Sequence, residues 1–325
     1  MSRPVRALAL HDRHPSEVDI LSDVKAGLRR TPKRLSSRYF YDARGSALFE
    51  RICEQPEYYL TRAELDLMTR HARDIADAVG PGALVVEYGS GSGQKTRLLL
   101  DSLAAPVAYV PVEISRAALT DSVNRLAPEF PAIEMLPVCA DFTERIMLPE
   151  PRREARRTLL YFPGSTIGNF DTREALALLR QMRGEMGANG AALIGADLRK
   201  DVTVMEAAYN DAAGVTADFT LNMLARFNRE LDADFDLASF RHRARYNPMA
   251  GRIETHIVSR RAQTAHIGDE AFEFAAGETI LVEYSCKYSI DNFSHLATRA
   301  NLQVARAWVD EEQQFAVYYL VRSKC

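Results

Sequence analysis

The sequence predicts an α/β fold: a doubly wound, mostly parallel sheet joined to a second, α+β unit. Two observations predict the sheet. Short apolar runs alternate with helical patterns between residues 61 and 197, and a glycine-rich loop follows the first run. A third observation predicts the second unit, because after Asp197 the pattern changes to interrupted helices and longer, alternating strands.

The strands of the predicted sheet are short apolar runs, which suit strands buried on both faces. Five such runs lie at residues 83–88, 107–114, 133–139, 158–163 and 191–197. Two more, at residues 303–309 and 315–322, follow a helical pattern at 290–300. This terminal helix–strand–strand unit indicates a sheet whose last strand is antiparallel rather than a wholly parallel sheet.

The helices are predicted from apolar residues at helical spacing and from capping residues. Over residues 61–79, Leu65 and Met68 begin an apolar stripe, and Thr61 with Glu64 predicts a capping box. Further helices are expected after Gly93, after Ser115 and after Asp171, the last with Glu174 as capping partner.

The second unit is predicted from the change of pattern after Asp197. Residues 201–231 are helical with an interruption at Gly214, and residues 252–261 and 278–288 alternate as in an antiparallel sheet. We therefore expect two domains. The substrate-binding domain would comprise residues 1–60 and 198–286, and the cofactor-binding domain residues 61–197 and 287–325.

The composition is that of an ordinary globular protein and excludes several function classes. The chain carries 44 acids and 41 bases, so its formal charge of −3 would not attract nucleic acid or anionic lipid. No apolar stretch approaches the ~20 residues of a membrane span. The four cysteines and seven histidines lack C-x-x-C and H-E-x-x-H spacing. We expect a cytoplasmic monomer without metal, nucleic-acid or membrane partners.

The stretch VVEYGSGSGQKT, residues 85–96, places three glycines directly after the first predicted strand. Gly89, Gly91 and Gly93 let the main chain bend and approach a ligand closely. Open α/β sheets bind ligands at this end of their strands. The G-x-G-x-x-G dinucleotide fingerprint fails, because Gln94 stands where its third glycine belongs. Taken alone, the triplet could equally be a tight turn.

Carboxylates at three strand ends favour a cationic adenosine ligand at this loop. Glu113, at the end of the second strand, can accept hydrogen bonds from ribose hydroxyls. Asp141 follows the third strand and can accept from an adenine amine while Phe142 lies along the base. Glu87, at the entrance of the loop, would attract positive charge and repel pyrophosphate. Together they predict S-adenosylmethionine (SAM) and a class I SAM-methyltransferase sheet.

Four longer blocks of sequence carry a more specific resemblance. They are TPKRLSSRYFYDARGSALFERICEQPEYYLTRAE, YFPGSTIGNF, YNDAAGVTADF and LVEYSCKY. With these blocks the chain, from about residue 20 to its C-terminus, resembles the histidine-specific Nα-methyltransferases of ergothioneine biosynthesis. The resemblance implies a SAM-dependent enzyme that methylates the α-amine of L-histidine three times, giving hercynine.

The resemblance also implies roles for individual residues. It places the cofactor contacts at Gly89, Lys95, Glu113, Asp141 and Phe142. It places the amino-acid contacts at Tyr58, Asn169, Tyr209, Glu283 and Ser285, with Tyr41 near the reacting amine. Independently, Asn169 lies in the loop after the fourth strand, close to where the amine must meet the methyl group. Two positions depart from the family: Glu113 replaces an expected Asp, and Thr255 replaces a Met beside the imidazole, which leaves the strictness of side-chain selection open.

Strand periodicity supports part of this set independently. In ILVEYSCK, alternate side chains put Glu283 and Ser285 on one face with Lys287. A carboxylate and a hydroxyl there could read both nitrogens of an imidazole, although a solvent-exposed polar face is the alternative. Asn169 could instead be a turn or capping residue, and the three tyrosines could be packing residues.

Three other functions stay open. The chain could methylate another amino acid, such as tryptophan, or could be a binding module that retains the SAM fold without catalysis. A nicotinamide or flavin oxidoreductase is disfavoured by the missing glycine at position 94.

Overall fold

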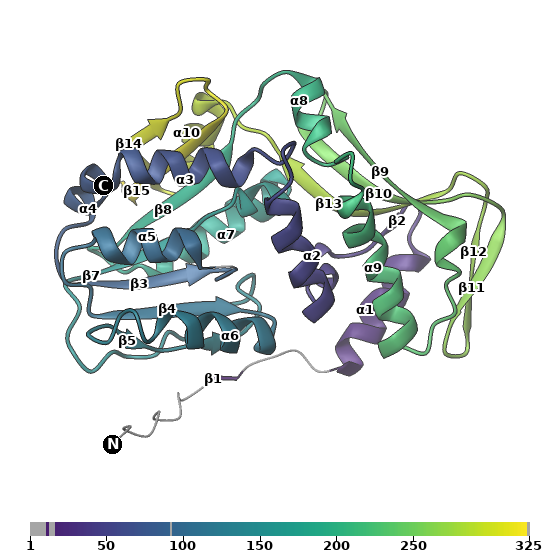
Figure 1. Ribbon diagram of the computed structural model, residues 1–325, viewed down its shortest axis with the longest axis horizontal. Coiled ribbons are helices and arrows are strands. Elements are labelled where there is room, and N and C mark those ends of the chain that lie inside the picture. The colour runs from purple at the N-terminus through teal and green to yellow at the C-terminus, as the bar shows by residue number, and fades with distance from the viewer. Residues whose placement is uncertain (1–10, 13–16, 92, 324–325) are drawn as a thin grey trace.

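The computed structural model describes residues 11–12, 17–91 and 93–323, and Figure 1 shows them arranged in two lobes. The first lobe contains a nine-stranded sheet, and the second contains a four-stranded sheet and a two-stranded hairpin. Helix α2 (Ala43–Cys53) lies between the lobes in Figure 1.

The large sheet has the strand order β1-β6-β4-β3-β7-β8-β15-β14, with β5 beside β4. Its strands are β1 (His11–Asp12), β3 (Ala83–Tyr88), β4 (Ala108–Glu113), β5 (Glu134–Met135), β6 (Val138–Cys139), β7 (Arg157–Phe162), β8 (Ala191–Asp197), β14 (Leu302–Val309) and β15 (Phe315–Arg322). Strands β3, β4, β7 and β8 are parallel, and β15 is antiparallel to β8. The predicted doubly wound sheet with an antiparallel last strand is therefore confirmed.

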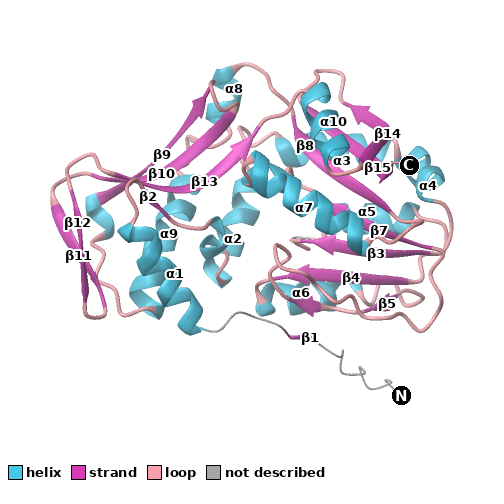
Figure 2. Cartoon of the chain, turned by 180° about the vertical axis from the view of Figure 1, so that it is seen from behind, coloured by secondary structure: helices cyan, strands magenta, loops and turns pink. Residues whose placement is uncertain are grey.

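Helices cover both faces of this sheet because its strands are apolar on both sides. On β3, Val85 packs into one core with the helices seen in front in Figure 1, whereas Val86 packs into the other core with the helices seen in front in Figure 2. The first group comprises α3 (Leu60–Arg70), α4 (Ala72–Val79), α5 (Gln94–Ser102) and α6 (Arg116–Leu126). The second comprises α7 (Thr172–Glu185) and α10 (Ile290–Arg299).

The second lobe is built around a sheet of order β2-β13-β10-β9. Its elements are β2 (Lys33–Arg34), β9 (Phe240–Asn247), β10 (Arg252–Ser259), β13 (Thr279–Cys286), the hairpin strands β11 (Gln263–Ile267) and β12 (Glu270–Phe274), and the helices α1 (Glu17–Arg29), α8 (Val202–Ala207) and α9 (Val215–Glu230). The N-terminal segment joins this lobe, because β2 pairs with β13 and Phe49 of α2 packs 6.0 Å from Phe219 of α9. The predicted antiparallel pairing of β10 with β13 is confirmed.

Two local predictions are wrong. The helix expected over residues 61–79 is divided at His71 into α3 and α4, and the residue that caps α3 is Tyr59. Glu64 therefore does not complete a capping box. It is buried, accepts a hydrogen bond from the Gly164 amide at 2.8 Å and forms an ion pair with Lys95. The strand expected over residues 133–139 is likewise divided, into β5 and β6, around Pro137.

The described part of the chain contains no helix long and apolar enough to cross a membrane. Within the same residues, no group of three or more His, Cys, Asp or Glu side chains is arranged to hold a metal ion. Cys53, Cys139 and Cys286 are free thiols.

The predicted capping box of α7 is confirmed and gives a test of local stability. Asp171 accepts hydrogen bonds from the Arg173 and Glu174 amides, both at 2.9 Å, and the Glu174 carboxylate accepts from the Asp171 amide at 2.8 Å. Asp171→Ala should lower the free energy of unfolding by about 1 kcal/mol, measured by urea denaturation. Asp171→Asn keeps an acceptor and should retain most of that stability. An equal loss in both variants would contradict the capping role.

Candidate active site

The glycine loop after β3 leaves open space beside its main chain. Gly89 and Gly91 have φ angles of 79° and 42°, in the left-handed region that glycine tolerates best. A Cβ built at either residue would have no atom of another described residue within 4 Å, apart from its chain neighbours. Gly93 then begins α5 from a left-handed conformation. The loop thus presents an uncluttered backbone at the carboxyl end of β3, as close contact with a ligand requires.

Glu113 lies beside this loop as the last residue of β4. Its carboxylate accepts a hydrogen bond from the Ser115 amide at 3.1 Å. Burial raises the pKa of Glu113, while backbone amides, including that of Ser90 in the glycine loop, act in the opposite direction. A carboxylate bound by backbone amides keeps lone pairs for hydroxyl groups of a ligand.

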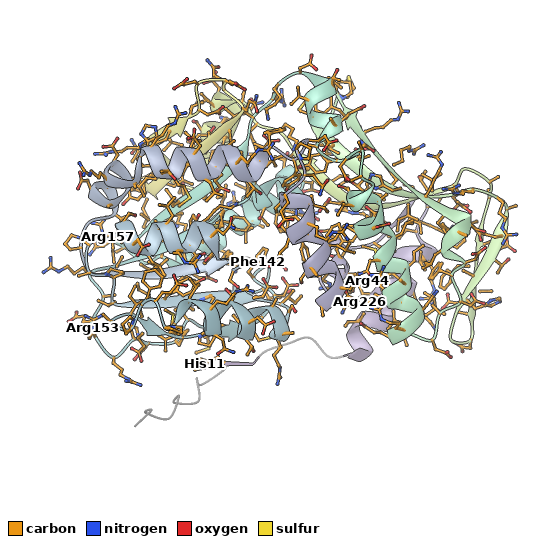
Figure 3. All side chains as sticks on the ribbon, viewed as in Figure 1. His11, Arg44, Phe142, Arg153, Arg157 and Arg226 are labelled. Carbon is orange, nitrogen blue, oxygen red and sulfur yellow. The ribbon has the colours of Figure 1, made fainter. Side chains whose placement is uncertain are left out.

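Asp141 and Phe142 follow β6 on the same edge of the sheet. Asp141 accepts hydrogen bonds from the Thr143 hydroxyl at 2.6 Å and from the Arg38 guanidinium at 3.4 Å. Phe142 stacks on Tyr88 with ring centroids 5.3 Å apart and planes inclined by 10°. Figure 3 shows Phe142 near the tips of β3 and β4, on the side of the first lobe that faces the second. Both residues therefore lie at the carboxyl-end edge of the large sheet, as expected from the sequence.

Glu87 is buried, whereas the sequence analysis placed it at the entrance of the loop. Lys95 is also largely buried. The Glu87 carboxylate is only 2% exposed and accepts hydrogen bonds from the Thr96 and Tyr109 hydroxyls, both at 2.6 Å. Burial raises the pKa of Glu87 to about 7. Lys95 lies on α5, as Thr96 does, and its ion pair with Glu64 ties α5 to α3. Glu87 is thus buried rather than placed at the mouth of the loop, and its bond with Thr96 joins β3 to α5.

The predicted amino-acid contacts lie on strands β10 and β13 and in the loops before α3 and after α8. Ser285 and the Tyr209 hydroxyl are 2.6 Å apart and share a hydrogen bond. The Tyr58 ring lies 6.2 Å from the Tyr209 ring, edge to face. Thr255 on β10 is directly opposite Glu283 in the strand register and is buried. The structure therefore brings all five of these predicted residues together.

Tyr41 links this group to the cofactor side of the site. Its pKa is raised well above 10, first by burial and then by the nearby carboxylates of Glu283 and Glu113. Its ring packs edge to face against Phe49 and Phe219 at 5.9 and 5.8 Å. Tyr41 thus lies near carboxylates of both lobes and remains a neutral phenol.

Asn169 ends the short helix η2 (Thr166–Asn169) that follows β7. This helix lies tightly against β13, since a Cβ on Gly168 would be 2.8 Å from the Cys286 carbonyl oxygen. A pocket of about 520 Å³ is lined by both Asn169 and Glu283. The loop after β7 and Glu283 of β13 therefore border one pocket between the lobes.

The sequence analysis missed a buried ion pair next to these residues. Lys287 is 0% exposed on its side chain and lies 2.6 Å from the Asp197 carboxylate. Its ammonium also donates hydrogen bonds to the Tyr209 and Ser285 hydroxyls. The strand pattern had placed Lys287 on the face of Glu283 and Ser285, but nothing local in the sequence identifies Asp197 as its partner.

Comparison with known proteins decides the family. Residues 20–322 match the family described as "Histidine-specific methyltransferase, SAM-dependent". The chain belongs to this family. It is 39% identical to the histidine N-alpha-methyltransferase of Mycolicibacterium smegmatis, over 92% of this chain and 94% of that protein. It is also 39% identical to the protein of that name from Mycobacterium tuberculosis, over 91% of this chain and 92% of the relative.

A fungal relative shows the same region within a longer protein. The ergothioneine biosynthesis protein 1 of Neurospora crassa is 28% identical over 98% of this chain, which covers 36% of that protein.

The family to which the chain belongs is SAM-dependent, so this methyltransferase is a SAM-dependent enzyme. The residues beside the glycine loop, at the edge of the large sheet, fit that cofactor. The open backbone at Gly89 and Gly91 and the amide-bound carboxylate of Glu113 suit an adenosine without phosphate.

Glu113 gives a test of the cofactor site in this methyltransferase. Glu113→Ala removes the acceptor for two ribose hydroxyls and should weaken S-adenosylhomocysteine binding by roughly ten- to a hundredfold in calorimetry. Glu134→Ala is a matched control, because Glu134 lies on the neighbouring strand β5 and pairs with Arg152 at the surface. Equal affinities for wild type and Glu113→Ala would remove Glu113 from the site.

Proposed function

We propose that this methyltransferase transfers three methyl groups to the α-amine of L-histidine and so forms hercynine in ergothioneine biosynthesis. The observation that carries the proposal is the position of Glu283 and Ser285 on one face of β13, where Glu283 lines a pocket that Asn169 also lines. The names of the mycobacterial and fungal relatives support the same substrate and pathway.

We assign the cofactor to the edge of the large sheet and the amino acid to the second lobe. Residues 61–197 with 287–325 would form the cofactor-binding domain, and residues 1–60 with 198–286 the substrate-binding domain. The SAM contacts would be Glu87, Gly89, Gly91, Lys95, Glu113, Asp141 and Phe142. When bound, SAM supplies an electrophilic methyl group on a cationic sulfonium.

The side chain and the α-amine of histidine would be read by different residues. Glu283 accepts a hydrogen bond from one imidazole nitrogen and Ser285 donates one to the other, while the Tyr58 hydroxyl donates to the carboxylate. Tyr209 lies beside Tyr58 and holds Ser285 through the hydrogen bond between their hydroxyls. Asn169 and Tyr41 orient the amine. Thr255 is small and lies opposite Glu283 in the register, so the side-chain site has more room than a methionine would leave.

The chemistry requires positioning more than acid–base catalysis. Holding the amine in line with the methyl group can supply ~7 to 11 kcal/mol of the barrier reduction. The amine must be neutral to attack, and its proton passes to water, because the raised pKa of Tyr41 keeps that residue a phenol. A phenol and an amide beside the nitrogen can tolerate a product that ends as a quaternary cation.

The proposed reaction is tested with a panel of amino acids and SAM, analysed by mass spectrometry. Histidine should gain three methyl groups, and fragmentation should place all of them on the α-nitrogen. Preferential methylation of tryptophan would replace histidine as the substrate. Methylation of a ring nitrogen would refute the pose, and absence of turnover with every amino acid would favour a binding module.

Glu283 gives a test of side-chain selection. Glu283→Ala removes the carboxylate acceptor, so kcat/KM for histidine should fall by roughly ten- to a hundredfold while phenylalanine is affected little. Glu278→Ala is the control, since Glu278 precedes the same strand but pairs with Lys33. An equal fall for histidine and phenylalanine would show that Glu283 is structural.

A further inference from the structure

We infer that Lys287 is a positioning residue that makes Ser285 a hydrogen-bond donor only, so that the side-chain site selects rings that present an acceptor nitrogen. The inference rests on the proposed function, in which the substrate ring lies against Glu283 and Ser285.

The three hydrogens of the Lys287 ammonium are all committed. Its Nζ lies 2.6 Å from Asp197 Oδ2, 2.8 Å from the Tyr209 hydroxyl and 2.9 Å from Ser285 Oγ. An ammonium has three donors and no acceptor. Both hydroxyls must therefore accept from Lys287, and each has one lone-pair direction occupied before any substrate binds.

The remaining hydrogen bond between the two hydroxyls fixes the direction of Ser285. Tyr209 and Ser285 are 2.6 Å apart, so one hydrogen lies between them. A phenol is the better donor and an alkyl hydroxyl the better acceptor, which favours donation from Tyr209 to Ser285. Ser285 Oγ then accepts from both Lys287 and Tyr209. Its two lone pairs are occupied and only its O–H is left for a ligand.

The ammonium is held in place by a network that extends into the large sheet. Asp197 also accepts hydrogen bonds from the Tyr59 hydroxyl at 2.9 and 2.8 Å and pairs with Lys200. Burial alone would lower the pKa of Lys287, but the Asp197 carboxylate and Tyr209 raise it above its ordinary value. Lys287 therefore stays charged and keeps its three bonds.

This arrangement gives the site complementary polarity at neighbouring positions of one strand face. Glu283 offers an acceptor, and Ser285 offers a donor. A neutral imidazole presents one N–H and one acceptor nitrogen, which matches both groups. A ring that presents N–H groups to both positions would place one of them against the Ser285 hydrogen, and a ring without nitrogen would leave both protein groups unpaired.

The test compares two substrate analogues that differ only at the acceptor nitrogen. Thiazolylalanine carries a ring nitrogen without N–H, and thienylalanine carries none, so neither can donate to Glu283 and its contribution cancels. Both ring isomers of thiazolylalanine are used, because they place the nitrogen at either imidazole position. Wild-type enzyme with saturating SAM should favour one thiazolyl isomer by about tenfold in kcat/KM, the value of one hydrogen bond.

Lys287→Met should reduce this preference to about twofold or less. Without the ammonium, Tyr209 has a free lone pair and Ser285 can turn its hydrogen toward Tyr209 instead of the substrate. A general structural defect would lower kcat/KM for both analogues and leave their ratio unchanged. A ratio that stays near tenfold in Lys287→Met would therefore overturn the inference.

Three further variants keep the test decisive. Lys287→Met/Tyr209→Phe should restore the preference, because Ser285 then has no phenol oxygen to which it could donate. Lys200→Met should keep the wild-type ratio, because Lys200 contacts Asp197 and Tyr59 on the far side of the network. If Lys287→Met does not fold, Lys287→Met/Asp197→Asn removes the buried pair as a unit and should show the same reduced ratio.

The outcomes separate the inference from the proposed function. If the wild-type enzyme trimethylates histidine but prefers neither thiazolyl isomer to thienylalanine, the ring does not meet the Ser285 donor, and the inference falls while the reaction stands. If histidine is not a substrate at all, the proposed function fails with it.

Discussion

The buried contact between Lys287 and Asp197 joins the two sheets at the point where the chain passes from one to the other. Asp197 is the last residue of β8, and Lys287 directly follows β13. The main chain is joined at the same place, since the amide of Tyr288, next to Lys287, donates to the Asp197 carbonyl oxygen at 3.0 Å. Removing one partner of such a pair leaves an uncompensated buried charge, so the geometry of the pair is enforced strongly. The position of the Ser285 end of β13 relative to the large sheet depends on this contact.

The N-terminal segment completes the site that this junction creates. Tyr41 and Tyr58 come from the first 60 residues, yet the electrostatic environment of each includes Glu283 on β13. The same Tyr41 is influenced by Glu113 on the large sheet. Arg38 adds a direct bond to Asp141 at 3.4 Å. A segment that precedes the sheet in sequence therefore lies between its cofactor edge and the second lobe.

The sequence predicted features that depend on local pattern and missed those that depend on distant partners. The strands β3, β8 and β15 have the predicted bounds, because apolar runs between turn residues define them. Glu64 was misread as a capping residue, because its partners Lys95 and Gly164 lie 31 and 100 residues away. Lys287 was placed on the correct strand face, but its role follows from Asp197, Tyr209 and Ser285, which only the tertiary structure brings together. The sequence analysis also missed β9, in which three arginines and a histidine leave few apolar positions, and the β11–β12 hairpin, whose strands are only five residues long.

The distribution of charge in the site agrees with a reaction whose product becomes more cationic than its substrate. The carboxylates Glu113 and Asp141 lie at the cofactor edge, and Glu283 lies on the strand that we assign to the substrate ring. The groups assigned to the amine, Asn169 and Tyr41, are neutral, and the raised pKa of Tyr41 keeps it so. A carboxylate in contact with the nitrogen would bind a quaternary ammonium more tightly than the initial amine and would retain the product. Neutral oxygen groups bind each methylation state more evenly, so successive transfers can proceed without trapping the last one.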